Sequence, residues 1–185
     1  MDKSIPNPYF SVELSESQVN YIREMALKIL EKDLQKTVQV LPNPHISVSY
    51  LLGNVDLNEI EKVAEEIVEA PFKMNVIGFD SIESSYYGGT IIAIALNHSD
   101  DFLYSQDLLK EVLCSEEVKV KQYKGGFRAH LSLFLLKDLT ESEKALLPRY
   151  LELVFNQNPH KEITGEKFCM YNPDRVKIIE KNFKG

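Results

Sequence analysis

A short motif that occurs twice constrains this chain more than any other feature of its sequence. His45 and Ser47 open one apolar segment, and His130 and Ser132 open another in the same arrangement. Side chains in a β-strand alternate between two faces, so each His shares a face with the Ser two places later, and apolar side chains occupy the other face. The pattern therefore predicts two half-buried strands that each present a His and a Ser on one side.

Composition limits the number of domains, the cellular compartment and the kinds of partner that we expect for this chain. The 185 residues, of which 44% are hydrophobic, predict a single domain over residues 1–185 with a sizeable core. Without an apolar run of about 18 residues or a signal-peptide core, we expect an intracellular protein, cytoplasmic or nuclear, with no membrane partner. The two cysteines, Cys114 and Cys169, form no metal-binding motif. The net charge of −7 argues against a broad basic face for duplex nucleic acid.

Periodicity and turn signals place the two motif strands in a chain of mixed helices and strands. Helices are predicted at residues 15–32, 56–70, 100–113 and after residue 140, with a kink or restart at Pro148. Capping boxes mark three of the starts, in the pairs Ser15 and Gln18, Asp56 and Glu59, and Thr140 and Glu143. Further strands are predicted at residues 9–14, 37–41, 72–79 and 90–96, with a hairpin over residues 162–180.

The two halves of the chain repeat one order of elements. Each half contains a helix, a His-x-Ser strand, a capped helix and further strands. This order predicts an α+β fold of two pseudo-symmetric lobes. We expect two antiparallel sheets that face each other across a central cleft, with the helices outside and the motif strands on either side of the cleft.

The four motif side chains together suffice for acid–base chemistry on a phosphate ester. One neutral imidazole can take a proton from an attacking 2′-hydroxyl or water, and the other, as imidazolium, can protonate the leaving oxygen. Ser47 and Ser132 can donate hydrogen bonds to the non-bridging oxygens. No carboxylate cluster suited to a metal is evident, so we expect no metal and no other cofactor. His45 and His130 are the predicted catalytic pair.

On these motifs the chain resembles the 2H phosphoesterase superfamily, which is defined by paired His-x-Ser/Thr motifs on such a two-lobed fold. The strands HISVS and HLSLF, and the late segment GEKFC, are most similar to the branch of the U6 snRNA 3′-exonucleases. The resemblance extends from about Tyr9 to Phe183. It implies that the two His are catalytic and that the two Ser bind phosphate.

The same branch carries a tyrosine shortly before its second motif, and Tyr123 is the matching residue in this chain. Lys124 and Arg128 lie close to it in the sequence. Aromatic and basic side chains together suit a single-stranded end, because every base offers a face for stacking. We therefore predict that Tyr123, Lys124 and Arg128 bind substrate, and Tyr86 and Tyr87 are a second candidate pair for stacking.

Three functions fit these observations. The first is a monomeric, metal-independent phosphodiesterase that trims the 3′ end of single-stranded RNA and leaves a 2′,3′-cyclic phosphate. The second is a phosphodiesterase for small nucleotides, such as 2′-5′ oligoadenylates, cyclic dinucleotides or cyclic phosphates, as in viral immune evasion. The third is an RNA- or nucleotide-binding module without turnover.

Overall fold

The computed structural model describes residues 8–34, 38–42, 44–52, 56–69, 73–97, 99–113, 119–120 and 129–184. These residues form an α+β structure, as the sequence predicts. The helices are α1 (Glu16–Leu34), α2 (Leu57–Ile67), α3 (Asp100–Leu113) and α4 (Glu141–Gln157). The strands are β1 (Tyr9–Leu14), β2 (Gln39–Val40), β3 (His45–Leu52), β4 (Lys73–Ser84), β5 (Gly89–Asn97), β6 (Lys119–Val120), β7 (His130–Leu136), β8 (Glu162–Tyr171) and β9 (Lys177–Asn182).

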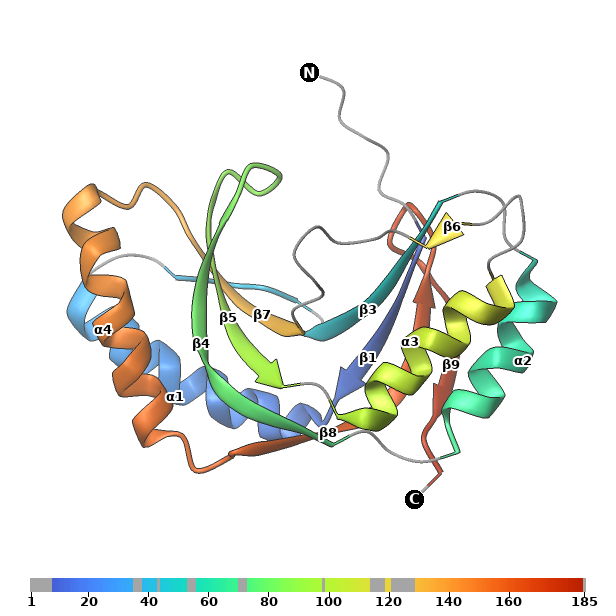
Figure 1. Ribbon diagram of the computed structural model, residues 1–185. Helices are drawn as coiled ribbons and strands as arrows, with labels where there is room; N and C mark the ends of the chain where they lie inside the picture. Colours follow the sequence, from blue (N-terminus) through green and yellow to red (C-terminus); the bar gives the residue numbers. More distant parts are fainter. Residues whose placement is uncertain are drawn as a thin grey trace.

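The strands form two antiparallel halves that curve up on either side of the molecule (Figure 1). One half has the order β2, β7, β5, β4, and the other has the order β8, β1, β3, β6, with β9 beside β8. The halves join where residues 73–75 of β4 pair with residues 162–164 of β8, and again where Ile46 of β3 pairs with Leu131 of β7. The predicted two-sheet fold is confirmed, and the two sheets prove to be continuous with each other.

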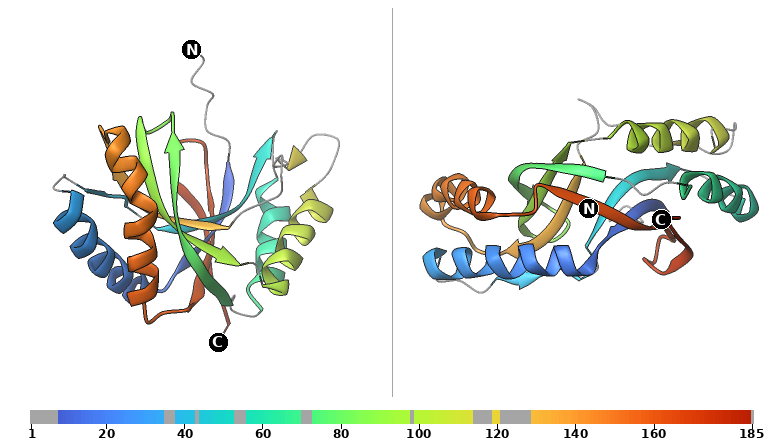
Figure 2. Two further views of the ribbon diagram at one scale, coloured as in Figure 1. Left: turned by 60° about the vertical axis from the view of Figure 1, so that its left-hand side comes forward. Right: turned by 90° about the horizontal axis from the view of Figure 1, so that it is seen from below.

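The described helices cover the outer faces of the two halves in pairs (Figure 2). α1 packs against α4, which lies on β4, and α2 packs against α3. A hydrogen bond of 2.7 Å from the Gln106 side chain to the Val48 carbonyl ties α3 to β3. α1 follows β1 but packs with α4 on the half that contains β4. α3 follows β5 but packs on the half that contains β3. Each of these helices therefore crosses to the half opposite its preceding strand. Of the helices in the described ranges, none has the length and apolar character that crossing a membrane requires.

β5 is buried on both of its faces, as its continuous apolar run predicts. Ile92 and Ile94 belong to the main hydrophobic core beneath the helices. Ile91 and Ala93 point the other way and pack in a smaller apolar cluster with Leu135 of β7. The strand therefore anchors the half of the sheet that carries the second motif.

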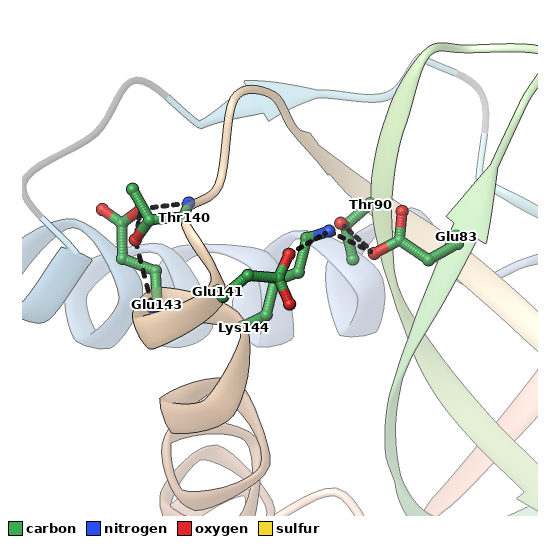
Figure 3. A network of polar contacts seen from close by, with 6 residues as sticks. All are labelled: Glu83, Thr90, Thr140, Glu141, Glu143 and Lys144. Atoms are coloured by element: carbon green, nitrogen blue, oxygen red, sulfur yellow. Dashed lines mark hydrogen bonds and ion pairs between the residues drawn. The ribbon is translucent and has the colours of Figure 1, made fainter.

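α4 begins at the predicted capping box and is tied there to the β4–β5 hairpin (Figure 3). The Thr140 N–H donates to the Glu143 carboxylate at 2.7 Å, and the Glu143 N–H donates to the Thr140 hydroxyl at 3.3 Å. Lys144, in the same turn, lies 3.9 Å from the Glu83 carboxylate, which also accepts the Thr90 hydroxyl at 2.8 Å. The start of α4 thus holds the hairpin near its turn, where Glu83 pairs with Thr90.

α4 continues through Pro148 and does not restart there. The proline lies inside the helix, and its side chain is exposed to solvent. A proline removes one backbone donor from a helix. Because this face is open to solvent, water can bond the carbonyl that loses its helical partner, so the helix can tolerate the loss of one hydrogen bond.

Candidate active site

Two antiparallel strands bring the His-x-Ser motifs together at the junction between the halves of the sheet. His45 is the first residue of β3, and His130 is the first residue of β7. The two strands pair at Ile46 and Leu131, and both of these side chains are fully buried in the core. The motif side chains on either side of this pair therefore point to the opposite face.

The register of that pair sets how the four motif side chains face one another. Continued by one residue in each direction, it places His45 opposite Ser132 and Ser47 opposite His130. All four side chains are half-buried, and all four line one cavity of about 580 Å³. One bound group can therefore contact both motifs at once.

The rest of the cavity lining is rich in tyrosine. Its other described residues are Tyr9, Gln39, Leu41, Pro42, Tyr50, Tyr86, Tyr87, Ile91, Tyr171 and Arg175. Within the described part of this lining there is no aspartate or glutamate, and Arg175 supplies a fixed positive charge. Such a lining suits an anionic ligand that also carries flat, partly apolar rings.

Tyrosine rings hold the His45 side of the cavity in place. Tyr9 stacks on the His45 ring with 5.4 Å between centroids, and the Tyr171 ring lies 5.9 Å from that of His45. Tyr9 and Tyr171 also stack on each other at 5.1 Å. The Ser47 hydroxyl lies 3.3 Å from the Tyr50 hydroxyl, within hydrogen-bond distance. These contacts restrain the plane of the imidazole and the position of the Ser47 side chain.

The two tyrosines beside His45 remain protonated. Burial raises the pKa of Tyr9 to about 12. Burial, together with the hydrogen bond that Tyr171 donates to Glu13 at 2.5 Å, also raises the pKa of Tyr171. Glu13 lies opposite His45 in the β1–β3 register and pairs with Lys177 at 2.8 Å. Burial alone would raise the pKa of Glu13, but the hydrogen bonds from Lys177 and Tyr171 hold it below its ordinary value.

A polar cluster that the sequence did not reveal lies beside this wall, on β1, β8 and β9. Glu13, Cys169 and Glu180 form the one group of three potential metal ligands found within the described ranges. Lys177 contacts both carboxylates, at 2.8 and 2.6 Å. Burial raises the pKa of the Cys169 thiol to about 12, so the thiol is protonated. Because Lys177 already pairs with both carboxylates, the cluster does not fit a metal ion.

Some of the predicted site residues lie within the described ranges, and others do not. The motif residues meet in one cavity, and Tyr86 and Tyr87 line it as well. Tyr123, Lys124 and Arg128 fall outside the described residues. Tyr9, Tyr171 and Arg175 also line the cavity and were not among the predicted site residues. The two tyrosines lie on predicted strands, but their approach to His45 depends on which strands are neighbours, and that information is not local in the sequence.

Comparison with known proteins identifies the class of fold. The architecture matches the two-lobed 2H phosphoesterase fold that the paired motifs predict. No protein-family model and no curated protein matches the sequence. Among solved structures, TT0787 of Thermus thermophilus superposes with a TM-score of 0.61 at 15% identity, over 96% of this chain and 98% of its own.

Two further solved structures share the fold. Usb1 of Kluyveromyces marxianus, solved with uridine monophosphate, has a TM-score of 0.53 at 11% identity, over 96% of this chain and 99% of its own. LigT of E. coli, solved with 3′-AMP, has a TM-score of 0.50 at 12% identity, over 97% of this chain and 98% of its own. At such identities these matches show the shared fold.

Proposed function

We propose that this protein is a metal-independent phosphodiesterase that removes nucleotides from the 3′ end of RNA. The observation that carries the proposal is the convergence of His45, Ser47, His130 and Ser132 in one cavity. The fold lends support, because Usb1 and LigT were solved with uridine monophosphate and with 3′-AMP, respectively. The lining is rich in tyrosine and, in its described part, free of carboxylates, so it suits the rings and the phosphate of a nucleotide.

The two histidines perform the two proton transfers of the reaction. The 2′-hydroxyl of the penultimate nucleotide attacks the last phosphorus, and the neutral imidazole takes its proton. The bond from phosphorus to the 5′-oxygen breaks, and the imidazolium of the other histidine gives its proton to that oxygen. The products are an RNA one nucleotide shorter, which ends in a 2′,3′-cyclic phosphate, and a free nucleoside.

The two serines stabilise the charge that grows on the phosphate. Hydroxyl donors aimed at the non-bridging oxygens act where negative charge develops in the transition state. Continued from the Ile46–Leu131 pair, the register sets Ser132 opposite His45 and Ser47 opposite His130. This supports an arrangement in which donors and proton-transfer groups alternate around one phosphate. Tyr50, at 3.3 Å from Ser47, helps to hold that hydroxyl in position.

Mass analysis of the products from a short oligoribonucleotide with a 3′-hydroxyl tests the proposal. We expect a series of shortened products that each end in a cyclic phosphate, together with free nucleosides. His160→Ala is the matched control, because its ring packs edge-on against Tyr21 at 5.0 Å and is not among the residues that line the cavity. An oligonucleotide that stays intact in all conditions would contradict the proposal.

A phosphodiesterase for small nucleotides is the second candidate function. The net charge of −7 favours it, because a negative protein repels a long polyanion more than a short one. Parallel assays on 2′-5′ oligoadenylate, cyclic GMP-AMP and a 2′,3′-cyclic nucleotide separate the two activities by their relative rates. Tight binding of these compounds without cleavage would instead indicate a binding module.

A further inference from the structure

Two hairpin turns from opposite halves of the sheet meet beside the cavity. Tyr86 and Tyr87 lie in the turn between β4 and β5, and Arg175 lies in the turn between β8 and β9. Figure 1 shows both turns at the same end of the molecule. The Arg175 guanidinium donates a hydrogen bond of 2.9 Å to the Tyr87 hydroxyl. Its central carbon lies 5.0 Å from the Tyr86 ring centroid and 5.7 Å from that of Tyr87. We call these three residues the Tyr–Arg bridge.

The bridge brings one cation and one largely exposed aromatic ring to the cavity. All three residues line the cavity, and within its described lining Arg175 is the one residue with a fixed charge. The hydrogen bond to Tyr87 uses one of the five guanidinium N–H donors and leaves others for a ligand. Tyr86 is 64% exposed and stands edge-on to Tyr87, so a flat group has room to stack on it. The bridge can therefore contact an anion through Arg175 and a flat ring through Tyr86 at the same time.

The backbone at Arg175 indicates that the side chain is needed for more than the turn. Its φ is 61°, in the left-handed region where glycine is the ordinary residue. The turn closes through backbone groups and Asn172, since the Arg175 N–H donates to the Asn172 carbonyl at 3.0 Å and the Val176 N–H to the Asn172 side chain at 2.8 Å. A glycine would make the Arg175 backbone bond equally well and without strain. Residues held in such conformations are concentrated at functional sites.

We propose that the Tyr–Arg bridge is a substrate-binding element that recognises a terminal or free nucleotide, with Arg175 on its phosphate and Tyr86 on its base. The inference rests on the proposed function, because it takes a nucleotide as the ligand. The bridge joins the two halves of the sheet at the cavity, so a ligand that ends there is accommodated more readily than a chain that must pass through. The substrate class is therefore the end of an oligonucleotide or a small nucleotide.

Binding of uridine 5′-monophosphate and of uridine, measured by titration calorimetry, tests the bridge without requiring cleavage, because the phosphate of a 3′-terminal nucleotide is on its 5′-oxygen. Arg175→Gly should weaken binding of the monophosphate by about tenfold or more, because the lost contact is a charged hydrogen bond to phosphate, and should affect binding of uridine much less. Its thermal midpoint should be unchanged or higher, since glycine suits the turn. Tyr86→Ala should weaken both ligands by roughly five- to a hundredfold, because both carry the base.

Matched variants separate this role from general effects of charge and folding. Arg149→Ala removes an exposed arginine of α4 and should leave both affinities unchanged. Arg175→Lys should bind the monophosphate more tightly than Arg175→Gly and less tightly than the wild type. The bridge proposal is overturned if the wild type binds no monophosphate, if folded Arg175→Gly binds it normally, or if Arg149→Ala weakens it equally. A protein that binds through Arg175 and cleaves no RNA would instead refute only the proposed function.

Discussion

The two histidines illustrate how single residues serve the site without carrying the fold. His45 and His130 are half-buried at the first positions of β3 and β7, whereas their neighbours Ile46 and Leu131 are fully buried in the core. The apolar neighbours hold the strands together, and the histidines face the cavity. Substitution of a histidine should therefore affect turnover much more than stability.

We predict that His45→Ala and His130→Ala each reduce turnover by about two to four orders of magnitude, the usual contribution of a general acid or base. Thermal unfolding should remain cooperative and close to that of the wild type. Initial rates on a 3′-labelled oligoribonucleotide provide the measurement, with His160→Ala as the control. Near-normal turnover in either variant would assign that histidine a structural role.

The motif residues were predictable because strand alternation is a local property. A His and a Ser two places apart share a face in any strand, whatever the strand pairs with. Tyr9 and Tyr171 were not predictable in the same way, because they reach His45 through the pairing of β1 with β3 and with β8. Arg175 was equally hidden, since its contact with Tyr87 joins residues 88 positions apart in the chain.

At the scale of elements, an ion-pair chain holds β1, β8 and β9 together beside the site. Glu13 on β1 pairs with Lys177, which also contacts Glu180, and Glu180 in turn contacts Lys167 at 3.0 Å on β8. The Tyr171 hydroxyl donates to Glu13, so the chain also fixes one wall of the cavity. Glu13 is thus the carboxylate that links the ion-pair chain to the cavity wall.

The pKa of Glu13 in the folded protein lies below its ordinary value of 4.5, so the ionised carboxylate stabilises the fold above that pH. This stabilisation is lost as the pH falls from about 4.5 through the lowered pKa. We predict that Glu13→Gln lowers the free energy of unfolding by about 1–2 kcal/mol at neutral pH, with a smaller difference in acid. Urea unfolding across pH measures it. Glu65 forms an exposed ion pair with Lys181, so the control variant Glu65→Gln should change the free energy of unfolding little.

Helix starts show where local sequence rules succeed and where tertiary contacts replace them. The capping box predicted at Thr140 forms, because both partners lie in one exposed turn. Ser15 and Gln18 carry the same pattern, but the Gln18 side chain accepts the Thr164 N–H of β8 at 3.3 Å. The capping-box pattern predicts that the Gln18 side chain bonds to the start of α1. It bonds instead to a strand residue that is 146 positions away in the chain.

We predict that Thr140→Ala lowers the free energy of unfolding by about 1 kcal/mol, the usual cost of losing an N-terminal cap. The loss should also loosen the β4–β5 hairpin near its turn, since Lys144 at the start of α4 contacts Glu83 (Figure 3). Urea titration is the measurement, and Ser142→Ala, an exposed change in the same turn, is the control. Equal stability of both variants would mean that the cap contributes nothing.

At the scale of the whole molecule, the order of elements predicts the two-lobed fold, but not how the lobes interlock. Repetition of helix and strand types along the chain is visible in the sequence, and it leads to the α+β class. The crossing of α1 and α3 to the opposite halves, and the short pairings of β4 with β8 and β3 with β7, depend on contacts between distant segments. These contacts bring the two motifs to the same cavity.

If the proposed function holds, two histidines in one cavity should also give the activity a characteristic pH dependence. One histidine must be neutral and the other charged, so the rate should pass through a maximum and fall on both sides. His45→Ala and His130→Ala should each abolish one limb of this profile, and the limb that is lost identifies the acid or the base. A rate that does not change with pH would exclude paired acid–base catalysis.

The central claim, that two histidines promote attack by a 2′-hydroxyl without a metal, is tested most directly by a pair of oligonucleotides in excess EDTA. The two substrates are identical except that one lacks the penultimate 2′-hydroxyl. We predict that the all-ribose substrate is cleaved at its full rate in chelator and that the deoxy substrate binds without being cut. Comparable cleavage of the deoxy substrate, or loss of ribose cleavage in EDTA with recovery on adding a divalent ion, would contradict this account.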